Sequence, residues 1–155
     1  MQKSMKNHMV RTLGAFAVAL ASAVALPSFS AHAEGIEARI IKNPNCGCCT
    51  MHGEYLREHG FDVTITNDEN VYDMATMIGI PEDMQGCHLT MIDGYAVSGH
   101  VPVESILRML EERPAITALT LPGMPMGSPG MGGAKEAPFE IYSLKNGKAE
   151  IYELR

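Results

Sequence analysis

Basic residues are scarce in this chain, and nowhere do they form a cluster. The 155 residues include 12 Lys and Arg against 18 Asp and Glu. Three of the basic residues, Lys3, Lys6 and Arg11, lie at the N-terminus ahead of an apolar run, and no Lys/Arg cluster follows them. Because binding to a nucleic-acid backbone requires clustered positive charge, the composition argues against nucleic acid as a partner.

The sequence also lacks an apolar run long enough to span a bilayer. The run from Leu13 to Leu26 is shorter than the ~20 residues of a membrane-spanning helix. Ala31-His32-Ala33 follows it with the small residues of a signal peptidase site. We therefore expect residues 1-33 to be a cleaved export signal. The mature chain would begin at Glu34, have no stable membrane span and carry nine basic against 18 acidic residues, a net charge of about −9.

Hydrophobic periodicity predicts one α/β domain over residues 34-120. Alternation indicates strands at about 36-42, 61-65, 87-92 and 95-98, the last two joined by the strong hairpin signal Asp93-Gly94. The spacing i, i+3, i+4 indicates three helices, which end near Gly60, near Gly79 and before Pro114. This order, βαβα followed by ββα, is that of a thioredoxin-like domain.

The first and third predicted helices have expected caps and apolar sides. Asn45 is placed to cap the first helix, and its apolar side is expected to be Met51, Tyr55 and Leu56. Pro102 suits the first turn of the third helix. The apolar stripe of that helix is expected to consist of Val103, Ile106, Leu107 and Leu110.

The chain changes character after residue 120. Residues 121-133, LPGMPMGSPGMGG, are too rich in Gly and Pro for regular structure, so we expect a functional loop. Residues 134-155 are expected to form a β-hairpin packed on the same domain, with strands at 139-144 and 149-154 and a type I′ turn at Asn146-Gly147. There is no internal repeat of solenoid length.

Three of the four cysteines fall within four residues. Cys46 and Cys49 form a C-x-x-C pair at a strand-to-helix junction, where free N–H groups and the helix dipole stabilise thiolates. Cys48 adds a sulfur that cannot be paired at the same time, and a bond between Cys48 and its neighbour Cys49 would be strained. Cys87 opens the third strand, whose start faces this helix tip in the expected topology.

Histidines near these cysteines are candidate nitrogen ligands. Strand alternation is expected to send Cys87 and His88 to opposite faces unless a bulge intervenes, so His88 is either a ligand or a structural hydrogen-bonder. His52 lies one helical turn after Cys49 on the same face and could add a nitrogen. His100 is either a ligand or a partner of backbone groups at a helix start.

Other residues with metal-binding side chains receive different predictions. His59 is expected to be exposed near a helix end and not to be a ligand. Met74 and Met109 are expected to serve packing. The loop methionines Met124, Met126 and Met131 have no helical or strand period, so they are either thioether ligands or part of a lid packed on the domain.

Thiolates, imidazoles and thioethers together favour Cu(I) over Mg, Ca or Mn. Zinc is the less favoured metal, because the crowded Cys-Gly-Cys-Cys favours the bridging of several ions over one tetrahedral site. Two other functions stay open. One is a thiol-disulfide oxidoreductase in which Cys46 attacks and Cys49 resolves; the other is a non-catalytic scaffold with two disulfides. No catalytic residue is assigned, since no acid or amide partner for a Cys/His dyad is evident.

Several spaced motifs carry a resemblance to a known family over about residues 36-131. The chain resembles the secreted CGCC family of metal-binding proteins, catalogued as a domain of unknown function, which includes CopG-type copper-resistance proteins. Several motifs in one order are more specific than a lone C-x-x-C. The motifs are Cys46-Gly47-Cys48-Cys49, Gly60-Phe61, Cys87-His88, Gly94-Tyr95, Gly99-His100-Val101-Pro102, Pro122-Gly123-Met124-Pro125 and Gly127-Ser128-Pro129-Gly130-Met131.

The resemblance implies a periplasmic, thioredoxin-like protein with a cysteine-bridged copper cluster and a redox step between Cu(I) and Cu(II). Its thiolates would be Cys46, Cys48, Cys49 and Cys87, surrounded by His and Met residues of the matching motifs. His52 departs from the family, since many members have an aromatic residue there. We therefore expect a periplasmic copper-binding protein of copper resistance. Its partners would be copper ions and other periplasmic copper-handling proteins.

Overall fold

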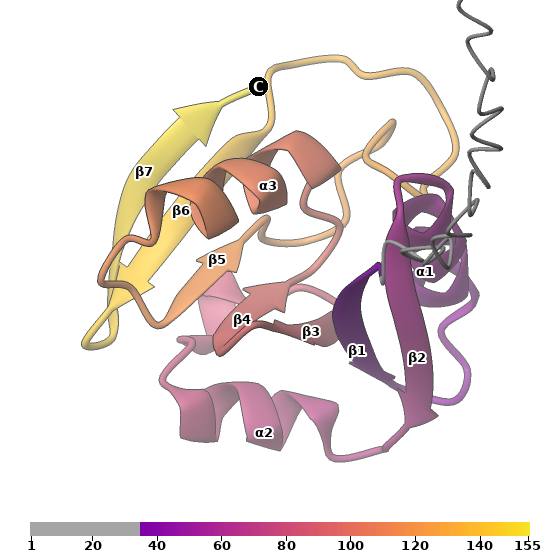
Figure 1. The fold of residues 1–155 in the computed structure, drawn as a ribbon, viewed down its shortest axis with the longest axis horizontal. Helices are drawn as coiled ribbons and strands as arrows, with labels where there is room; N and C mark the ends of the chain where they lie inside the picture. The colour runs from indigo at the N-terminus through magenta and orange to yellow at the C-terminus, as the bar shows by residue number, and fades with distance from the viewer. Residues whose placement is uncertain (1–34) are drawn as a thin grey trace, which may run out of the picture. The chain divides into compact units, whose positions relative to one another are not determined.

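The computed structural model describes residues 35-155, and the expected export signal lies outside these residues (Figure 1). The described part is a mixed α/β fold with one seven-stranded sheet and three α-helices. The strands are β1 (Ile36–Lys42), β2 (Phe61–Asn67), β3 (His88–Ile92), β4 (Tyr95–Ser98), β5 (Ala118–Thr120), β6 (Glu140–Lys145) and β7 (Lys148–Leu154). The helices are α1 (Gly47–Glu58), α2 (Val71–Ile78) and α3 (Val103–Glu112), with a short 3-10 helix, η1 (Glu82–Met84).

The strands lie in the order β2-β1-β3-β4-β5-β6-β7. β1 pairs in parallel with β2 and antiparallel with β3, so that Lys42 at the end of β1 lies opposite His88 at the start of β3. β4 pairs in parallel with β5, which in turn carries the C-terminal hairpin β6-β7 into the same sheet. Periodicity does not predict β5, because three residues are too few for an alternation signal.

Hydrophobic cores lie on both faces of the sheet. α1 and α3 pack on one face through Leu56, Ile106 and Met109, whereas α2 packs on the other through Val71 and Ala75. In Figure 1, α2 lies on the side of the sheet opposite α3. Successive side chains of a strand point to opposite faces, so β1, β3 and β4 supply both cores, whereas the core residues of β2 all lie on the side of α1 and α3.

Both predicted hairpin turns are confirmed. A type I′ turn requires positive φ at its two central residues. Asp93 and Gly94 have φ of 47° and 85°, and Asn146 and Gly147 have φ of 53° and 72°. Local turn chemistry therefore determines the register of β3 with β4 and of β6 with β7.

The predicted cap and apolar side of α1 are partly wrong. Cys46, not Asn45, occupies the N-cap position, and no side chain there makes a capping hydrogen bond. Met51 is 58% exposed. The buried face instead consists of Cys49, His52, Gly53 and Leu56, which follow the spacing i, i+3, i+4, i+7 with a polar histidine in an apolar position. Apolar character alone does not identify this face, because one of its four buried residues is a histidine.

The third helix shows a similar correction. Pro102 is its N-cap and not part of its first turn. Leu107, assigned to the apolar stripe, is exposed, whereas Met109 is fully buried in the core as predicted. Met74 packs partly buried against the core on the α2 side, which confirms its packing role. None of the helices within residues 35-155 has the length and apolar character to cross a membrane.

Candidate metal centre

A short turn between β1 and α1 places the cysteines at the start of the helix. The buried Lys42 donates from Nζ to the carbonyl oxygens of Asn43 and Pro44 at 3.1 and 3.2 Å. The Cys46 N–H donates to the Asn43 carbonyl at 3.0 Å, which closes the turn. Cys46 is then the N-cap of α1, and Cys48 and Cys49 lie in its first turn.

All four sulfurs gather at this helix start. Cys46 and Cys49 form a disulfide, whereas Cys48 and Cys87 are free. The Cys48 Sγ lies 3.4 Å from the Cys46 Sγ, and the Cys87 Sγ lies 3.4 Å from the Cys49 Sγ. Because all four Sγ atoms lie within 4.8 Å of one another, the sulfurs could together hold a metal ion once they are reduced.

The expectation that Cys87 and His88 point to opposite faces is wrong. β3 begins at His88, and Cys87 lies in a bend just before it, where strand alternation does not yet apply. The Cys87 Sγ is 3.5 Å from the His88 Nδ1. Gly86 holds this bend in place, since its N–H donates to the Ser98 Oγ at 2.8 Å and its Cα is packed against the backbone of Gly99.

His100 approaches the same sulfur from the segment between β4 and α3. Its Nε2 lies 3.1 Å from the Cys87 Sγ, and its Nδ1–H donates to the Pro129 carbonyl at 2.6 Å. Cys49, Cys87, His88 and His100 form a second group whose donor atoms lie within 4.8 Å of one another. Pro129 belongs to the Gly/Pro/Met loop, so the loop orients one of the candidate ligands.

His52 belongs to neither group of donors, although the sequence predicts it as a ligand. Its ring is fully buried, and both ring nitrogens have protein partners. Nε2 lies 3.1 Å from the Val101 carbonyl oxygen, and Nδ1 lies 3.0 Å from the His88 Nε2. His59, by contrast, is exposed near the end of α1, as predicted.

Burial controls the protonation of these groups. It lowers the pKa of His52 to about 4, with a further contribution from His100, and lowers the pKa of His88 and His100 as well. Burial, followed by the neighbouring sulfur of Cys48, raises the pKa of the Cys87 thiol to about 12. The imidazoles are therefore neutral near pH 7 and keep a lone pair, while a bound cation would be needed to stabilise the Cys87 thiolate.

The loop methionines are placed differently from the cysteines and histidines. Met124 and Met126 are 51% and 52% exposed, and Met131 is half-buried. Met126 lines a cavity of about 540 Å³ between the loop and the C-terminal hairpin, together with Leu121 and Phe139. Ligation by these thioethers stays a prediction.

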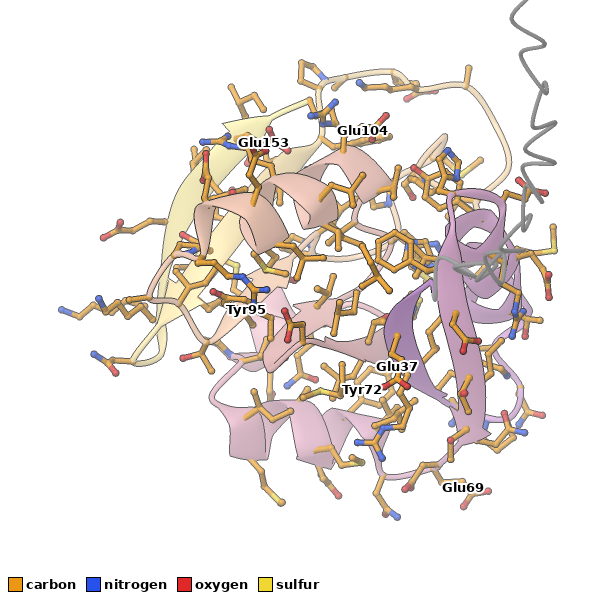
Figure 2. All side chains as sticks on the ribbon, viewed as in Figure 1. Glu37, Glu69, Tyr72, Tyr95, Glu104 and Glu153 are labelled. Carbon is orange, nitrogen blue, oxygen red and sulfur yellow. A yellow bond between two sulfur atoms is a disulfide. The ribbon has the colours of Figure 1, made fainter. Side chains whose placement is uncertain are left out.

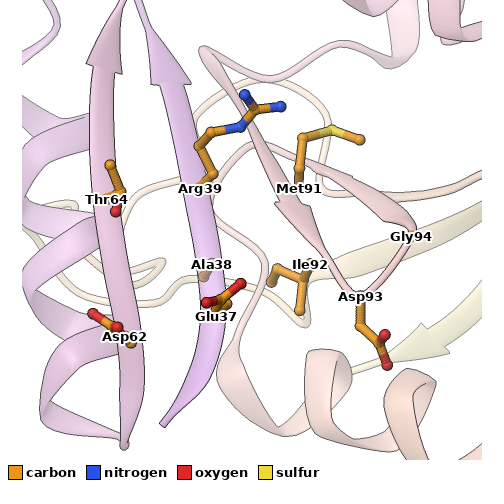
Figure 3. Close-up of a pocket in the computed structure, with 9 residues that line it drawn as sticks. All are labelled: Glu37, Ala38, Arg39, Asp62, Thr64, Met91, Ile92, Asp93 and Gly94. Carbon is orange, nitrogen blue, oxygen red and sulfur yellow. The ribbon is translucent and has the colours of Figure 1, made fainter. Parts of the chain in front are cut away.

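Another hollow, of about 380 Å³, lies around the opposite end of β1 (Figure 3). Its carboxylates come from Glu37, Asp62 and Asp93, and no cysteine or histidine of the described part lines it. Acidic side chains also point outward elsewhere, as the exposed Glu69 and Glu104 do in Figure 2. Neither Cys/His group found within residues 35-155 includes a carboxylate. This donor set fits a soft ion such as Cu(I), or zinc, better than Mg or Ca.

The sequence does not reveal the backbone groups that shape the site. The carbonyls of Val101 and Pro129 orient His52 and His100, and every residue type carries a carbonyl. Gly130 has a φ of 79°, and a Cβ there would lie 2.6 Å from the backbone nitrogen of His52. Its place between Pro129 and Met131 in a turn-forming segment is the one signal that could have indicated it.

The fold and the donor groups define a mixed α/β protein with a cysteine- and histidine-rich centre that could hold a metal ion. A family model described as a protein of unknown function, DUF411, matches residues 84-131. Two solved structures, described as copper resistance protein CopG, Form 1 and Form 2, are each 34% identical to this chain with a TM-score of 0.72. Both cover 79% of this chain, which covers 98% and 99% of them.

No curated protein matches the chain. The likeness to the CopG structures extends over almost their whole length. The chain therefore belongs to the family of the copper resistance protein CopG, and the resemblance drawn from its motifs is confirmed.

Proposed function

We propose that this protein is a periplasmic copper-binding protein that chelates several Cu(I) ions in a thiolate-bridged cluster and interconverts Cu(I) and Cu(II) in copper resistance. One observation carries the proposal: the two donor groups overlap. Cys49 and Cys87 belong both to the four-sulfur group and to the group with His88 and His100. Sulfurs shared between adjacent groups can bridge neighbouring ions, which is what a cluster requires.

We also propose that the cluster is built on a thioredoxin-like domain. The support is the order β1-α1-β2-α2-β3-β4-α3, with the first four strands arranged as β2-β1-β3-β4 and the C-x-x-C pair at the start of α1. In this description, residues 34-120 form the domain, residues 121-133 the loop and residues 134-155 a hairpin that extends its sheet.

The disulfide makes copper binding dependent on reduction. Two of the four sulfurs in the first group are joined as Cys46–Cys49, and a disulfide sulfur is not a thiolate ligand. A reductant supplies two electrons and two protons and yields two thiols, and the binding of Cu(I) then displaces the thiol protons into the solvent. Copper would then be protected by the loop, whose Pro129 already contacts His100.

The expected location and partners follow the same proposal. An export signal at residues 1-33 would place the acidic mature chain in the periplasm. The name of the related CopG structures refers to copper resistance. We propose copper ions and other periplasmic copper-handling proteins as partners of this chain.

The test is copper and zinc content per chain, with free thiols counted, before and after treatment with a reductant. We expect several copper ions on the reduced mature protein, none or few on the oxidised protein, and joint loss of the copper ions in Cys48→Ala. The variant Met77→Ala is a matched control, because this exposed sulfur lies on α2. Reduced protein that leaves Cu(I) with a weak competitor would overturn the proposal.

A second candidate function, thiol-disulfide oxidoreductase, is favoured by the disulfide itself. Cys46 is partly exposed, whereas Cys49 is fully buried, which suits attack by Cys46 and resolution by Cys49. This function predicts that the chain reduces an insulin disulfide equally well with Cys48→Ala. The scaffold alternative requires two disulfides, but Cys48 and Cys87 are both free in the structure.

A further inference from the structure

We infer that His52 is a positioning residue that fixes the tautomer of His88 and so presents the His88 Nδ1 lone pair to the metal centre. His52 lies in the fully buried face of α1, one turn after Cys49. The inference rests on the proposed function in one respect, namely that the lone pair is used by Cu(I). The proton positions themselves can be measured without copper.

The carbonyl oxygen of Val101 determines the first proton. A carbonyl can only accept, so the His52 Nε2, 3.1 Å away, must carry the hydrogen. A neutral imidazole has one N–H, which leaves the His52 Nδ1 as an acceptor. His52 is thus held as its Nε2–H tautomer by a backbone group.

The second proton follows from the first. The His88 Nε2 lies 3.0 Å from the His52 Nδ1, and because the latter accepts, the former must donate. The His88 Nδ1 then has no hydrogen, and this nitrogen lies 3.5 Å from the Cys87 Sγ. The chain of hydrogen bonds from Val101 through His52 to His88 thereby fixes the His88 tautomer whose Nδ1 lone pair faces the site.

Because both rings are buried, water cannot take the place of the His52 Nδ1 as the acceptor for the His88 N–H. The exposed fractions of the His52 and His88 side chains are 0% and 1%, and their ring centroids lie 4.9 Å apart. The backbone of Gly130 lies against the His52 backbone. Without the His52 acceptor, the buried His88 N–H would have no partner, and the ring would change its tautomer or its orientation.

His100 reaches the same sulfur by an independent route. Its Nδ1–H donates to the Pro129 carbonyl, so its Nε2 carries the lone pair that faces Cys87 at 3.1 Å. The two candidate ligands therefore use different nitrogens, Nδ1 in His88 and Nε2 in His100. Only the first depends on a side chain outside both donor groups. His52 has the position of an outer partner that orients a metal-binding histidine.

The direct test is long-range proton-nitrogen NMR of the imidazole rings in the reduced, metal-free protein near pH 7.5. We expect Nε2–H for His52 and His88 and Nδ1–H for His100. In His52→Phe, the His88 signal should shift to a mixture or to the other tautomer. In His52→Asn, whose Oδ1 can replace the Nδ1 acceptor, the His88 tautomer should be retained.

The functional arm measures Cu(I) affinity by competition with a chromophoric chelator. Loss of an outer partner typically costs about 10- to 100-fold in metal affinity, so we expect this loss in His52→Phe and recovery of most of it in His52→Asn. His59→Phe is the matched control, because His59 is the exposed C-cap residue of the same helix, and it should change neither readout.

Three results would overturn the inference. They are an Nδ1–H tautomer of His88 in the wild-type protein, an unchanged tautomer in His52→Phe, or an unchanged affinity in that variant. If the His52→Phe chain does not fold, the wild-type spectrum and the His52→Asn variant still decide. Failure of the proposed function looks different, since the wild-type protein would then show the expected tautomers but bind no Cu(I).

Discussion

The sulfur-rich start of α1 and the histidines behind it are built in opposite ways. Cys46 and Cys48 are partly exposed and lie within one helical turn. The three histidines, at most 1% exposed, come from α1, β3 and the segment before α3. Cys46 and Cys48 are therefore open to reductants, whereas the histidine rings are held by burial and by hydrogen bonds, two of which go to backbone carbonyls. One region is chemically responsive, and the other is structurally fixed.

The largest expected effect comes from the sulfur that joins the two regions. In the reduced protein, Cys87→Ala removes a donor from both groups and leaves the other three cysteines in place. We expect Cu(I) affinity to fall by more than about 100-fold, beyond the cost of losing an outer partner. Competition with a chromophoric chelator measures this loss. An effect no larger than that of His52→Phe would mean that Cys87 does not belong to the centre.

Acid should destabilise the folded protein through the buried histidines and not through the cysteines. The pKa of His52 is about 4 in the folded protein, below its ordinary 6.5, so the unfolded chain binds more protons between these values. Its contribution to stability is complete above pH 6.5 and declines as the pH falls toward 4. The shift corresponds to roughly 3 kcal/mol of unfolding free energy. The rings of His88 and His100 face His52, and Cys87 contacts His100. Burial also lowers the pKa of His88 and of His100, so both reduce the stability of the folded protein in acid as His52 does.

Urea unfolding of the reduced, metal-free protein at pH 7.5 and at pH 4.5 measures the effect of acid. His59→Phe should keep the full pH dependence, because His59 is exposed. The stability of His52→Phe should depend less on pH. Equal stability of the wild-type protein at both pH values would contradict burial of neutral histidines.

The contact between the loop and α1 should be disturbed by one methyl group. Gly130→Ala places a Cβ 2.6 Å from the backbone nitrogen of His52, at a residue whose φ is 79°. The loop must therefore move, which weakens the hydrogen bond from His100 to the Pro129 carbonyl. We expect a loss of about 1–3 kcal/mol, measured by urea unfolding. Gly132→Ala is the control, since nothing lies within 4 Å of the added atom. Equal stability of the two variants would contradict the contact.

The smallest effect is expected from the exposed thioethers. In the double variant Met124→Leu, Met126→Leu, Cu(I) affinity should fall by less than about 10-fold, because a neutral, half-exposed thioether binds more weakly than a buried thiolate. The same chelator competition measures it. A loss comparable to that of Cys87→Ala would place these methionines among the principal ligands.

Much of the fold follows from local patterns. The alternation in β1 and β2, the glycine that ends α2 and the Asp93-Gly94 and Asn146-Gly147 turns are short-range features, and the structure reproduces them. The pattern fails where burial depends on partners distant in sequence. β5 is a strand because β4 and β6 pair with it, and Met51 is exposed because α1 turns His52 inward.

The sequence by itself determined the crowding of Cys46, Cys48 and Cys49, since residues within one helical turn cannot separate. It also determined the turns, whose backbone angles depend on two or three neighbours. Only the tertiary structure decided that Cys87, His88 and His100 meet these sulfurs, and that His52 stands behind His88 instead of among the donors. The reason is physical: hydrogen bonds from buried imidazoles to carbonyls come from segments up to 49 residues apart, and no local pattern encodes such a distance.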